Sequence, residues 1–218
     1  MAQYDIDATG ASAEFSQAQP KLGPQDLLSL TELAVLSSDE RQVIEIGWIV
    51  SPSVNKDSRT HLFVYHWVNG IGTCFNACGF VAVSKKFRAG GPVTVGRVGT
   101  YAIQFHKDRW LVNYDGVELG YFPLSLWKAP AFKSVGEVQV FGEVDSPSAT
   151  TPRSQMGNGV LGTNPKSASI RDVRLIGGTA IKPFAYFSQE APTKYRIGLD
   201  DPTCVTSCGM HFGGPGFS

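Results

Sequence analysis

Apolar and polar residues alternate with a period of two in many short runs along this chain, and few segments show helical spacing. Clusters of Gly, Pro, Asp, Asn and Ser separate the runs, which is typical of strands joined by turns. One stretch, Pro24–Leu33, has a helix as its alternative. The pattern predicts strands at Glu14–Gln19, Ser29–Leu36, Gln42–Val50, His61–Val68, Gly79–Val83, Arg97–His106, Arg109–Tyr114, Val117–Tyr121, Val135–Val144, Ala168–Ile176 and Tyr195–Gly198.

About eleven short strands at regular spacing predict an all-β fold, an antiparallel two-sheet β-sandwich or jelly roll. The Asp115-Gly116 pair and the HKD segment at 106–108 predict tight hairpins between strands. A chain of 218 residues is long enough for one domain with a sizeable core. We therefore expect a single domain over residues 13–218, preceded by a flexible N-terminal arm over residues 1–12.

Two of the predicted strands carry a glutamate on the face that does not enter the core. Alternation places Glu45 opposite an apolar face of isoleucine, tryptophan and valine, and Glu143 opposite a row of valines. The strand at 61–68 places Tyr65 and Trp67 on one face, in a row of rings suited to lining a groove. A glutamate on the outer face of an antiparallel sheet is ordinarily just solvated, and aromatic rows ordinarily pack in the core. The alternation alone therefore leaves the function open.

Charge and motif content exclude several classes of function. The 19 basic and 19 acidic residues give zero net charge, so nothing predicts binding to nucleic acid or to a membrane surface. No apolar stretch approaches the roughly 20 residues of a membrane-spanning helix. The four histidines lack metal-ligand spacing, and the chain has no GxSxG or phosphate-binding glycine loop. We expect no metal and no cofactor.

The four cysteines form two CxxxC pairs, Cys74 with Cys78 and Cys204 with Cys208. The spacing favours two local disulfides, while a four-cysteine zinc site and free thiols remain the alternatives. Disulfides indicate an oxidising, extracellular setting. The N-terminus has neither the basic nor the apolar region of a signal peptide, so we expect a secreted protein in its mature form.

Five motifs, in order along most of the chain, resemble the signature of the neprosin family. They are IEIGWIVSPSVNKDSRTHLFVYHW at 44–67, GTCFNACGFV at 72–81, GYFP at 120–123, FGEV at 141–144 and SQMGNG at 154–159. The chain departs from the family pattern in the loop 54–57, at His66 and at Phe122. In place of these two single residues the family often has tryptophan. These departures are expected to change the contacts with substrate more than the catalytic reaction.

The resemblance implies a secreted, acid-active glutamic endopeptidase that cuts after proline, built on a β-sandwich catalytic domain. The catalytic pair of the family falls on Glu45 and Glu143. One carboxylate activates a water and the other, protonated, supplies a proton, which requires that the two share one groove. The sequence does not decide which glutamate is the base and which is the acid. The working assignment takes Glu45 as the base and Glu143 as the acid. The expected partner is a peptide or protein substrate, and the expected state is a monomer.

Six further residues have predicted roles in substrate binding. Tyr65 is expected to donate a hydrogen bond to the oxyanion, and Gln139 to orient Glu143 from the same strand face. Trp67 and Phe141 are expected to form an apolar wall for a proline ring. The loop after the second catalytic strand is expected to hold substrate backbone through two amides, Gln155 and Asn158. Two alternatives remain: a jelly-roll glycoside hydrolase with two catalytic glutamates, and a non-catalytic β-sandwich that binds sugar or protein.

Overall fold

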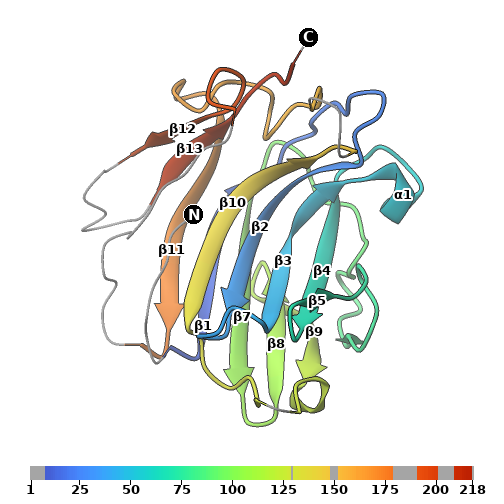
Figure 1. Cartoon of the computed structure of the whole chain (residues 1–218), viewed down its shortest axis with the longest axis vertical. Coiled ribbons are helices and arrows are strands. Elements are labelled where there is room, and N and C mark those ends of the chain that lie inside the picture. Colours follow the sequence, from blue (N-terminus) through green and yellow to red (C-terminus); the bar gives the residue numbers. More distant parts are fainter. Residues whose placement is uncertain (1–7, 129, 148–151, 179–190, 201–208, 218) are drawn as a thin grey trace.

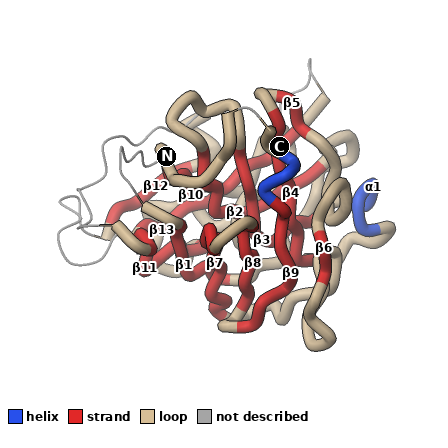
Figure 2. Tube along the Cα trace, turned by 90° about the horizontal axis from the view of Figure 1, so that it is seen from below, coloured by secondary structure: helices blue, strands red, loops and turns tan. Residues whose placement is uncertain are grey.

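The computed structural model describes residues 8–128, 130–147, 152–178, 191–200 and 209–217. Two antiparallel sheets pack face to face (Figures 1 and 2), and the predicted all-β sandwich is confirmed. We call the five-stranded sheet the front sheet and the eight-stranded sheet the back sheet, following the view of Figure 1. The described residues contain no helix long and apolar enough to cross a membrane.

The front sheet has the strand order β10-β2-β3-β4-β5. Its strands are β10 (Glu137–Asp145), β2 (Leu28–Leu36), β3 (Val43–Val50), β4 (His61–Val68) and β5 (Ile71–Gly72). The back sheet has the order β12-β13-β11-β1-β7-β8-β9-β6. Its strands are β12 (Arg196–Leu199), β13 (Met210–Gly213), β11 (Ala168–Ile176), β1 (Gly10–Ser16), β7 (Val98–His106), β8 (Arg109–Tyr114), β9 (Val117–Pro123) and β6 (Val81–Ala82).

The core fills the space between the two sheets. Alternation sends Ile44, Ile46 and Trp48 of β3 inward, where all three are fully buried. The indole N–H of Trp48 donates to the carbonyl oxygen of Ser16 at 3.1 Å, so the ring is buried without an unsatisfied donor. Burial of each such side chain stabilises the fold by roughly 1.5–3 kcal/mol. The inward face of β3 therefore fixes which residues remain on its outer face.

The two predicted hairpins are present. Asp115 and Gly116 join β8 to β9 with φ values of 48° and 71°, the left-handed conformation that the tight hairpin turn requires at both positions. Between β7 and β8, Lys107 has a φ of 58°. Pro24–Leu33, the one stretch with a helical alternative, contributes to strand β2 instead.

The N-terminal arm is shorter than predicted, because Gly10–Ser16 forms strand β1 between β7 and β11. Its small residues give a weak strand signal, yet both edges of β1 are hydrogen-bonded and Ala11 and Ala13 are buried. A Cβ at Gly10 would lie 2.8 Å from the Cα of Gln104, so the neighbouring strand needs glycine there. Residues 10–12 thus belong to the domain.

Short elements account for the other differences. Of the strand predicted at 79–83, only Val81–Ala82 forms a strand, β6. Strands β5 and β13 were not predicted, because they have too few residues to show alternation. Two short helices, α1 (Pro52–Asn55) and η1 (Leu124–Leu126), fall outside the predicted strands. Helix α1 occupies the start of the loop in which the chain departs from the family pattern, and it ends at Lys56, which has a φ of 65°.

Candidate functional site

The outer face of the front sheet carries three glutamates in a diagonal row. The register pairs Phe141 of β10 with Glu32 of β2, and Ala34 of β2 with Glu45 of β3. Glu143 lies two residues after Phe141 on β10, and Glu45 pairs with the residue two after Glu32 on β2. The three glutamates therefore lie on three adjacent strands, each displaced by two residues along the strand from the next. Diagonal neighbours of this kind have Cα atoms about 7–8 Å apart. The two predicted catalytic glutamates therefore share one sheet face, but β2 runs between their strands and adds a third carboxyl.

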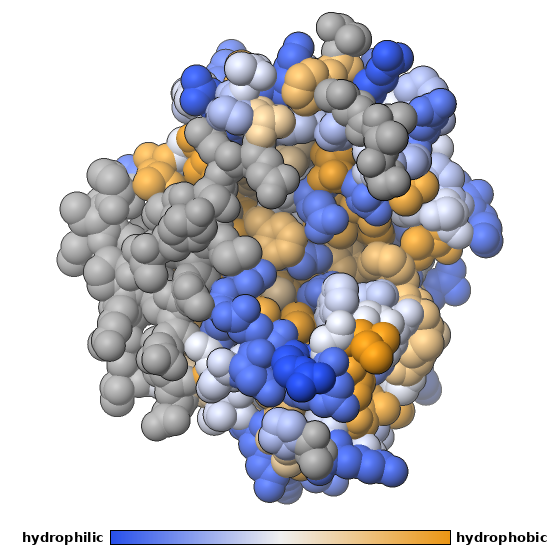
Figure 3. Space-filling view, in the orientation of Figure 1, coloured by the Kyte–Doolittle hydropathy of each residue, from blue (hydrophilic) through white to orange (hydrophobic). Residues whose placement is uncertain are grey.

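A groove of about 500 Å³ runs over these residues on the outer side of the front sheet. Figure 3 shows this face hollowed, with hydrophobic and hydrophilic surface side by side. The lining includes both predicted catalytic glutamates and four of the predicted substrate-binding residues. The groove is lined by Leu28, Leu30, Glu32, Ala34, Leu36, Glu40, Val43, Glu45, Tyr65, Trp67, Gly70, Phe75, Gln139, Phe141, Glu143 and Asp145.

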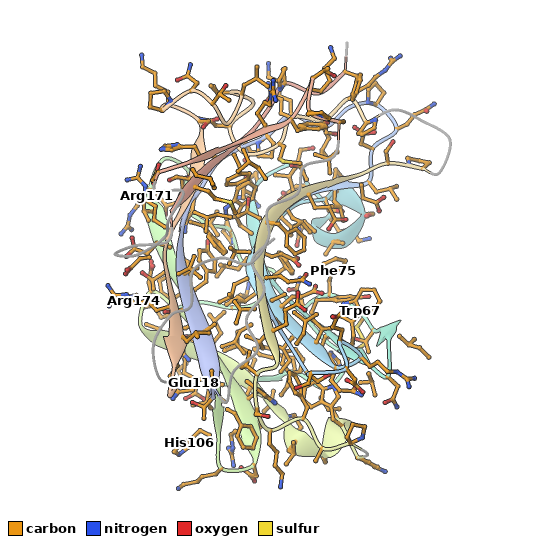
Figure 4. All side chains as sticks on the ribbon, turned by 60° about the vertical axis from the view of Figure 1, so that its left-hand side comes forward. Trp67, Phe75, His106, Glu118, Arg171 and Arg174 are labelled. Carbon is orange, nitrogen blue, oxygen red and sulfur yellow. A yellow bond between two sulfur atoms is a disulfide. The ribbon has the colours of Figure 1, made fainter. Side chains whose placement is uncertain are left out.

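Glu45 is held in a defined position by an indole. Trp67 Nε1 donates a hydrogen bond of 2.7 Å to Glu45 Oε1 (Trp67 is labelled in Figure 4). Burial raises the pKa of Glu45 to about 7, the Trp67 hydrogen bond opposes this shift, and the charge of Glu143 adds to it. Glu45 is therefore protonated at acid pH. Trp67 has a polar role beside Glu45 in addition to forming part of the wall of the groove.

Glu32 was missed by the sequence analysis. It is only 3% exposed, and burial raises its pKa well above the ordinary value, with the charges of Glu45 and Glu143 adding to the shift. The neutral, protonated form of this carboxyl is therefore favoured beyond the pH range in which an exposed glutamate ionises. The signal was the alternation of Leu28, Leu30, Glu32, Ala34 and Leu36, which matches that of the strand carrying Glu45. The predicted strand at Ser29–Leu36 contains Glu32, but alternation within one strand does not show which strands are its neighbours, so Glu32 was not placed beside the two predicted glutamates.

Two glycines near the glutamates have different surroundings. A Cβ at Gly47 would meet the backbone oxygen of Thr31 and lie 2.9 Å from the Cα of Glu32 and from the Cε1 atom of the buried Phe63, so glycine allows β3 to pack closely against its neighbours. A Cβ at Gly142 would instead strike the ring of Phe212 in the back sheet. The close approach expected at glycines in strands thus comes from the neighbouring strand β2 and the Phe63 ring at Gly47, and from packing between the sheets at Gly142.

Three aromatic rings line the β4 side of the groove. The Tyr65 ring lies 4.6 Å from the Phe75 ring and 5.9 Å from the Trp67 ring, centroid to centroid. Burial, with a further contribution from the charge of Glu45, raises the pKa of Tyr65, so its hydroxyl remains a hydrogen-bond donor. Phe75 was not predicted, because a loop residue between two cysteines carries no alternation signal.

Other predicted residues make contacts different from those expected. Gln139 Nε2 donates a hydrogen bond of 2.6 Å to Glu137 Oε1, whereas the expected partner was Glu143. Gln155 Oε1 accepts a hydrogen bond of 3.0 Å from the backbone of Lys21, and Asn158 Nδ2 donates one of 2.7 Å to the carbonyl oxygen of Lys166. These two amides stabilise their own loop, and neither belongs to the described residues that line the groove.

The disulfide between Cys74 and Cys78 is present, with a Cα–Cα distance of 5.8 Å. The second predicted pair, Cys204 and Cys208, lies outside the described residues. Within the parts of the chain that the structure describes, no group of three or more His, Cys, Asp and Glu side chains is arranged to hold a metal ion.

A second cavity, of about 470 Å³, adjoins the first. It shares Phe141 and Glu143 with the groove and continues past the edge strand β10 toward Tyr195, Met210 and Phe212. Glu143 is exposed between the two hollows. The surface available to an extended ligand is therefore longer than the groove alone.

Comparison with known proteins places the chain in a family. The family model named Neprosin matches residues 25–215, which is most of the chain and includes all three groove glutamates. The chain belongs to the Neprosin family. This membership supports a glutamic peptidase-type hydrolase. No match is found among curated protein sequences.

Several solved structures resemble this one weakly. Scytalido-glutamic peptidase, with a peptide-based transition-state analogue, is 7% identical with a TM-score of 0.45, and the match covers 97% of this chain and 95% of that chain. Chicken galectin 2 is 12% identical with a TM-score of 0.37, covering 71% of this chain and 95% of that chain. A native glycosidic hydrolase is 12% identical with a TM-score of 0.39, covering 68% of this chain and 61% of that chain. Likenesses this weak carry no argument about activity.

Proposed function

We propose that this chain is a secreted, acid-active glutamic endopeptidase that hydrolyses peptide bonds after proline, using Glu45 and Glu143 and no metal or cofactor. The observation that supports this best is that both glutamates line one groove, with Glu45 protonated at acid pH. Peptide hydrolysis without a metal needs one carboxylate to activate water and one carboxylic acid to supply a proton. The two glutamates line the same groove on either side of β2.

The surroundings of the two glutamates favour reversing the working assignment. Glu45 is half-buried with a raised pKa, so it is suited to be the general acid. Glu143 is exposed on the edge strand β10, where hydration stabilises a carboxylate, so it is suited to be the general base. The scissile peptide then lies across β2, over Glu32.

The proposed reaction proceeds in two steps. Glu143 takes a proton from a water whose oxygen attacks the scissile carbonyl carbon, and the Tyr65 hydroxyl donates a hydrogen bond to the oxyanion that forms. Glu45 then gives its proton to the amide nitrogen, and the carbon–nitrogen bond breaks to release the amine. Glu143 finishes protonated and Glu45 ionised, so exchange with solvent restores the starting state.

Secretion is supported by the Cys74–Cys78 disulfide, since such bonds persist in oxidising compartments. Proline specificity is supported by the aromatic rings of the groove, because aromatic-lined grooves bind proline-rich segments. The monomeric state expected from the sequence stays a prediction.

The proposal is tested by incubating the protein with a proline-rich polypeptide at pH 3 to pH 8 and identifying the cut sites by mass spectrometry. Glu45→Gln and Glu143→Gln are each expected to lower kcat at least ~100-fold, the lower end of what general acid–base catalysis contributes. Glu118→Gln is the matched control, because Glu118 lies on β9 of the back sheet (Figure 4). Cleavage that persists in both groove variants would reject the proposed pair. Turnover of xylan with no peptide cleavage would establish the glycoside hydrolase instead.

A further inference from the structure

The loop closed by the Cys74–Cys78 disulfide is attached to the edge of β4 beside the groove. Asn76 N–H donates to the carbonyl oxygen of Val64 at 2.9 Å, and Val64 N–H donates to Asn76 Oδ1 at 3.1 Å. Asn76 and Cys78 adopt left-handed backbone conformations, with φ values of 62° and 51°. Hydrogen bonds and the disulfide together hold this short loop in one position.

The loop places one aromatic ring on the wall of the groove. The Phe75 ring packs at 4.6 Å from the Tyr65 ring and at 5.6 Å from the Phe63 ring, centroid to centroid. Phe75 and Trp67 both lie on the outer side of the front sheet (Figure 4). Trp67 Nε1 donates to Glu45 and Tyr65 carries a hydroxyl, whereas Phe75 offers only an apolar ring. Phe75 therefore extends the wall next to Glu45 without competing for its hydrogen bonds.

We propose that Phe75 is a specificity-determining residue whose ring packs on the proline ring of the substrate, and that the Cys74–Cys78 disulfide holds it in position. This inference rests on the proposed function and names the contact by which the same site selects its substrate. A proline ring is apolar and rigid, so an ordered aromatic wall binds it with little loss of conformational entropy. A loop freed from the disulfide has to be ordered on binding, which weakens the same contact.

The first experiment compares two peptides that differ only in proline or alanine before the scissile bond. Phe75→Ala is expected to raise KM for the proline peptide about 10-fold, which is the size of effect that the loss of one apolar contact produces. KM for the alanine peptide should change little. Phe75→Leu is expected to lie between wild type and Phe75→Ala. The pH profile of kcat should not move, since Phe75 touches no proton that is transferred. Ile71→Ala is the control, because Ile71 is 71% exposed on β5 and is not among the groove-lining residues.

The disulfide is tested by a double variant, Cys74→Ala with Cys78→Ala, which leaves Cys204 and Cys208 unchanged. It is expected to lower the proline-to-alanine preference as Phe75→Ala does, and adding Phe75→Ala to it should have little further effect because both changes remove one contact. An unchanged preference in Phe75→Ala, or an equal loss for both peptides in a variant with a normal melting temperature, would overturn the inference.

Binding separates this inference from the proposed function. The proline peptide is titrated into the wild-type protein and into Phe75→Leu by calorimetry at a pH where no cleavage occurs. Weaker binding to Phe75→Leu supports the inference even if the wild type never cleaves a peptide, a result that would reject only the proposed function. Equal binding to the two proteins, or no binding to either, overturns the inference.

Discussion

At the residue scale, the groove depends on carboxyl groups placed where a negative charge is costly. Transferring a carboxylate from water into a protein interior is unfavourable, so a buried glutamate without a cationic partner keeps its proton. Glu32 is the most buried of the three groove glutamates, and Glu45 is half-buried. The protons of these two side chains are therefore part of the folded structure in acid.

Glu32→Gln is expected to make the protein more stable at pH 8 and to leave its stability unchanged at pH 4. The folded pKa of Glu32 is raised, so its contribution to stability is fully present below the unfolded pKa and is lost as pH rises through the folded pKa. An amide of the same shape does not titrate. We expect a gain on the order of 1–3 kcal/mol at pH 8, measured by urea unfolding. An equal loss at both pH values would contradict this account of Glu32.

Trp67→Phe is expected to extend activity to higher pH. The Trp67 hydrogen bond lowers the pKa of Glu45, so removing it raises that pKa above about 7. If Glu45 is the general acid, its protonated form then persists further into the neutral range, and the alkaline limb of the kcat profile moves up. If Glu45 is the base, the acid limb moves up instead, and activity at low pH falls. The pH–rate profile of the variant therefore decides the assignment.

At the element scale, alternation predicted which residues of β3, β4 and β10 face outward, but it did not predict which strands are neighbours in the sheet. Glu45 and Glu143 were assigned correctly to outer faces because their strands are long and strongly alternating. Strand pairing is long-range: β10 pairs with β2, which lies over 100 residues earlier in the chain. No local pattern contains that information. The position of Glu32 between the two predicted glutamates, and the ring of Phe75 beside them, therefore required the structure.

Gly47→Ala is expected to destabilise the front sheet. The added Cβ would meet the backbone oxygen of Thr31 on β2 and lie 2.9 Å from a ring atom of Phe63 on β4. Backbone cannot yield without loss of strand pairing, so we expect a cost of roughly 1–3 kcal/mol, as for other overpacked sites. The free energy of unfolding at pH 5 measures the effect. A variant as stable as wild type would show that the sheet tolerates a side chain at position 47.

At the scale of the whole molecule, two regions respond to acid in opposite senses. Glu32 and Glu45 in the groove have raised pKa values, so their contribution to stability is present in acid and is lost as pH rises. His66, buried against Phe122 and Trp127, has its pKa lowered by burial to about 4. The stability that depends on neutral His66 is present above the unfolded pKa of about 6.5 and is lost as pH falls toward 4.

His66→Gln is expected to make stability less sensitive to acid. The amide stays neutral and can still bond to Thr73, which now contacts His66 Nδ1 at 2.9 Å. Between pH 7 and pH 4 the variant should lose less free energy of unfolding than the wild type, by on the order of 1–3 kcal/mol. Thermal unfolding at both pH values measures this difference. Parallel losses in the two proteins would show that His66 does not titrate in this range.

The central position of β1 in the back sheet has a consequence for biosynthesis. Gly10 pairs with Gln104 on one side and with Ile176 on the other. During translation the first strand therefore emerges long before its second partner and waits, half-paired, until most of the chain has left the ribosome. High contact order of this kind slows folding. We expect β1 to complete its pairing only after β11 has been synthesised, and the purified chain to refold slowly for the same reason.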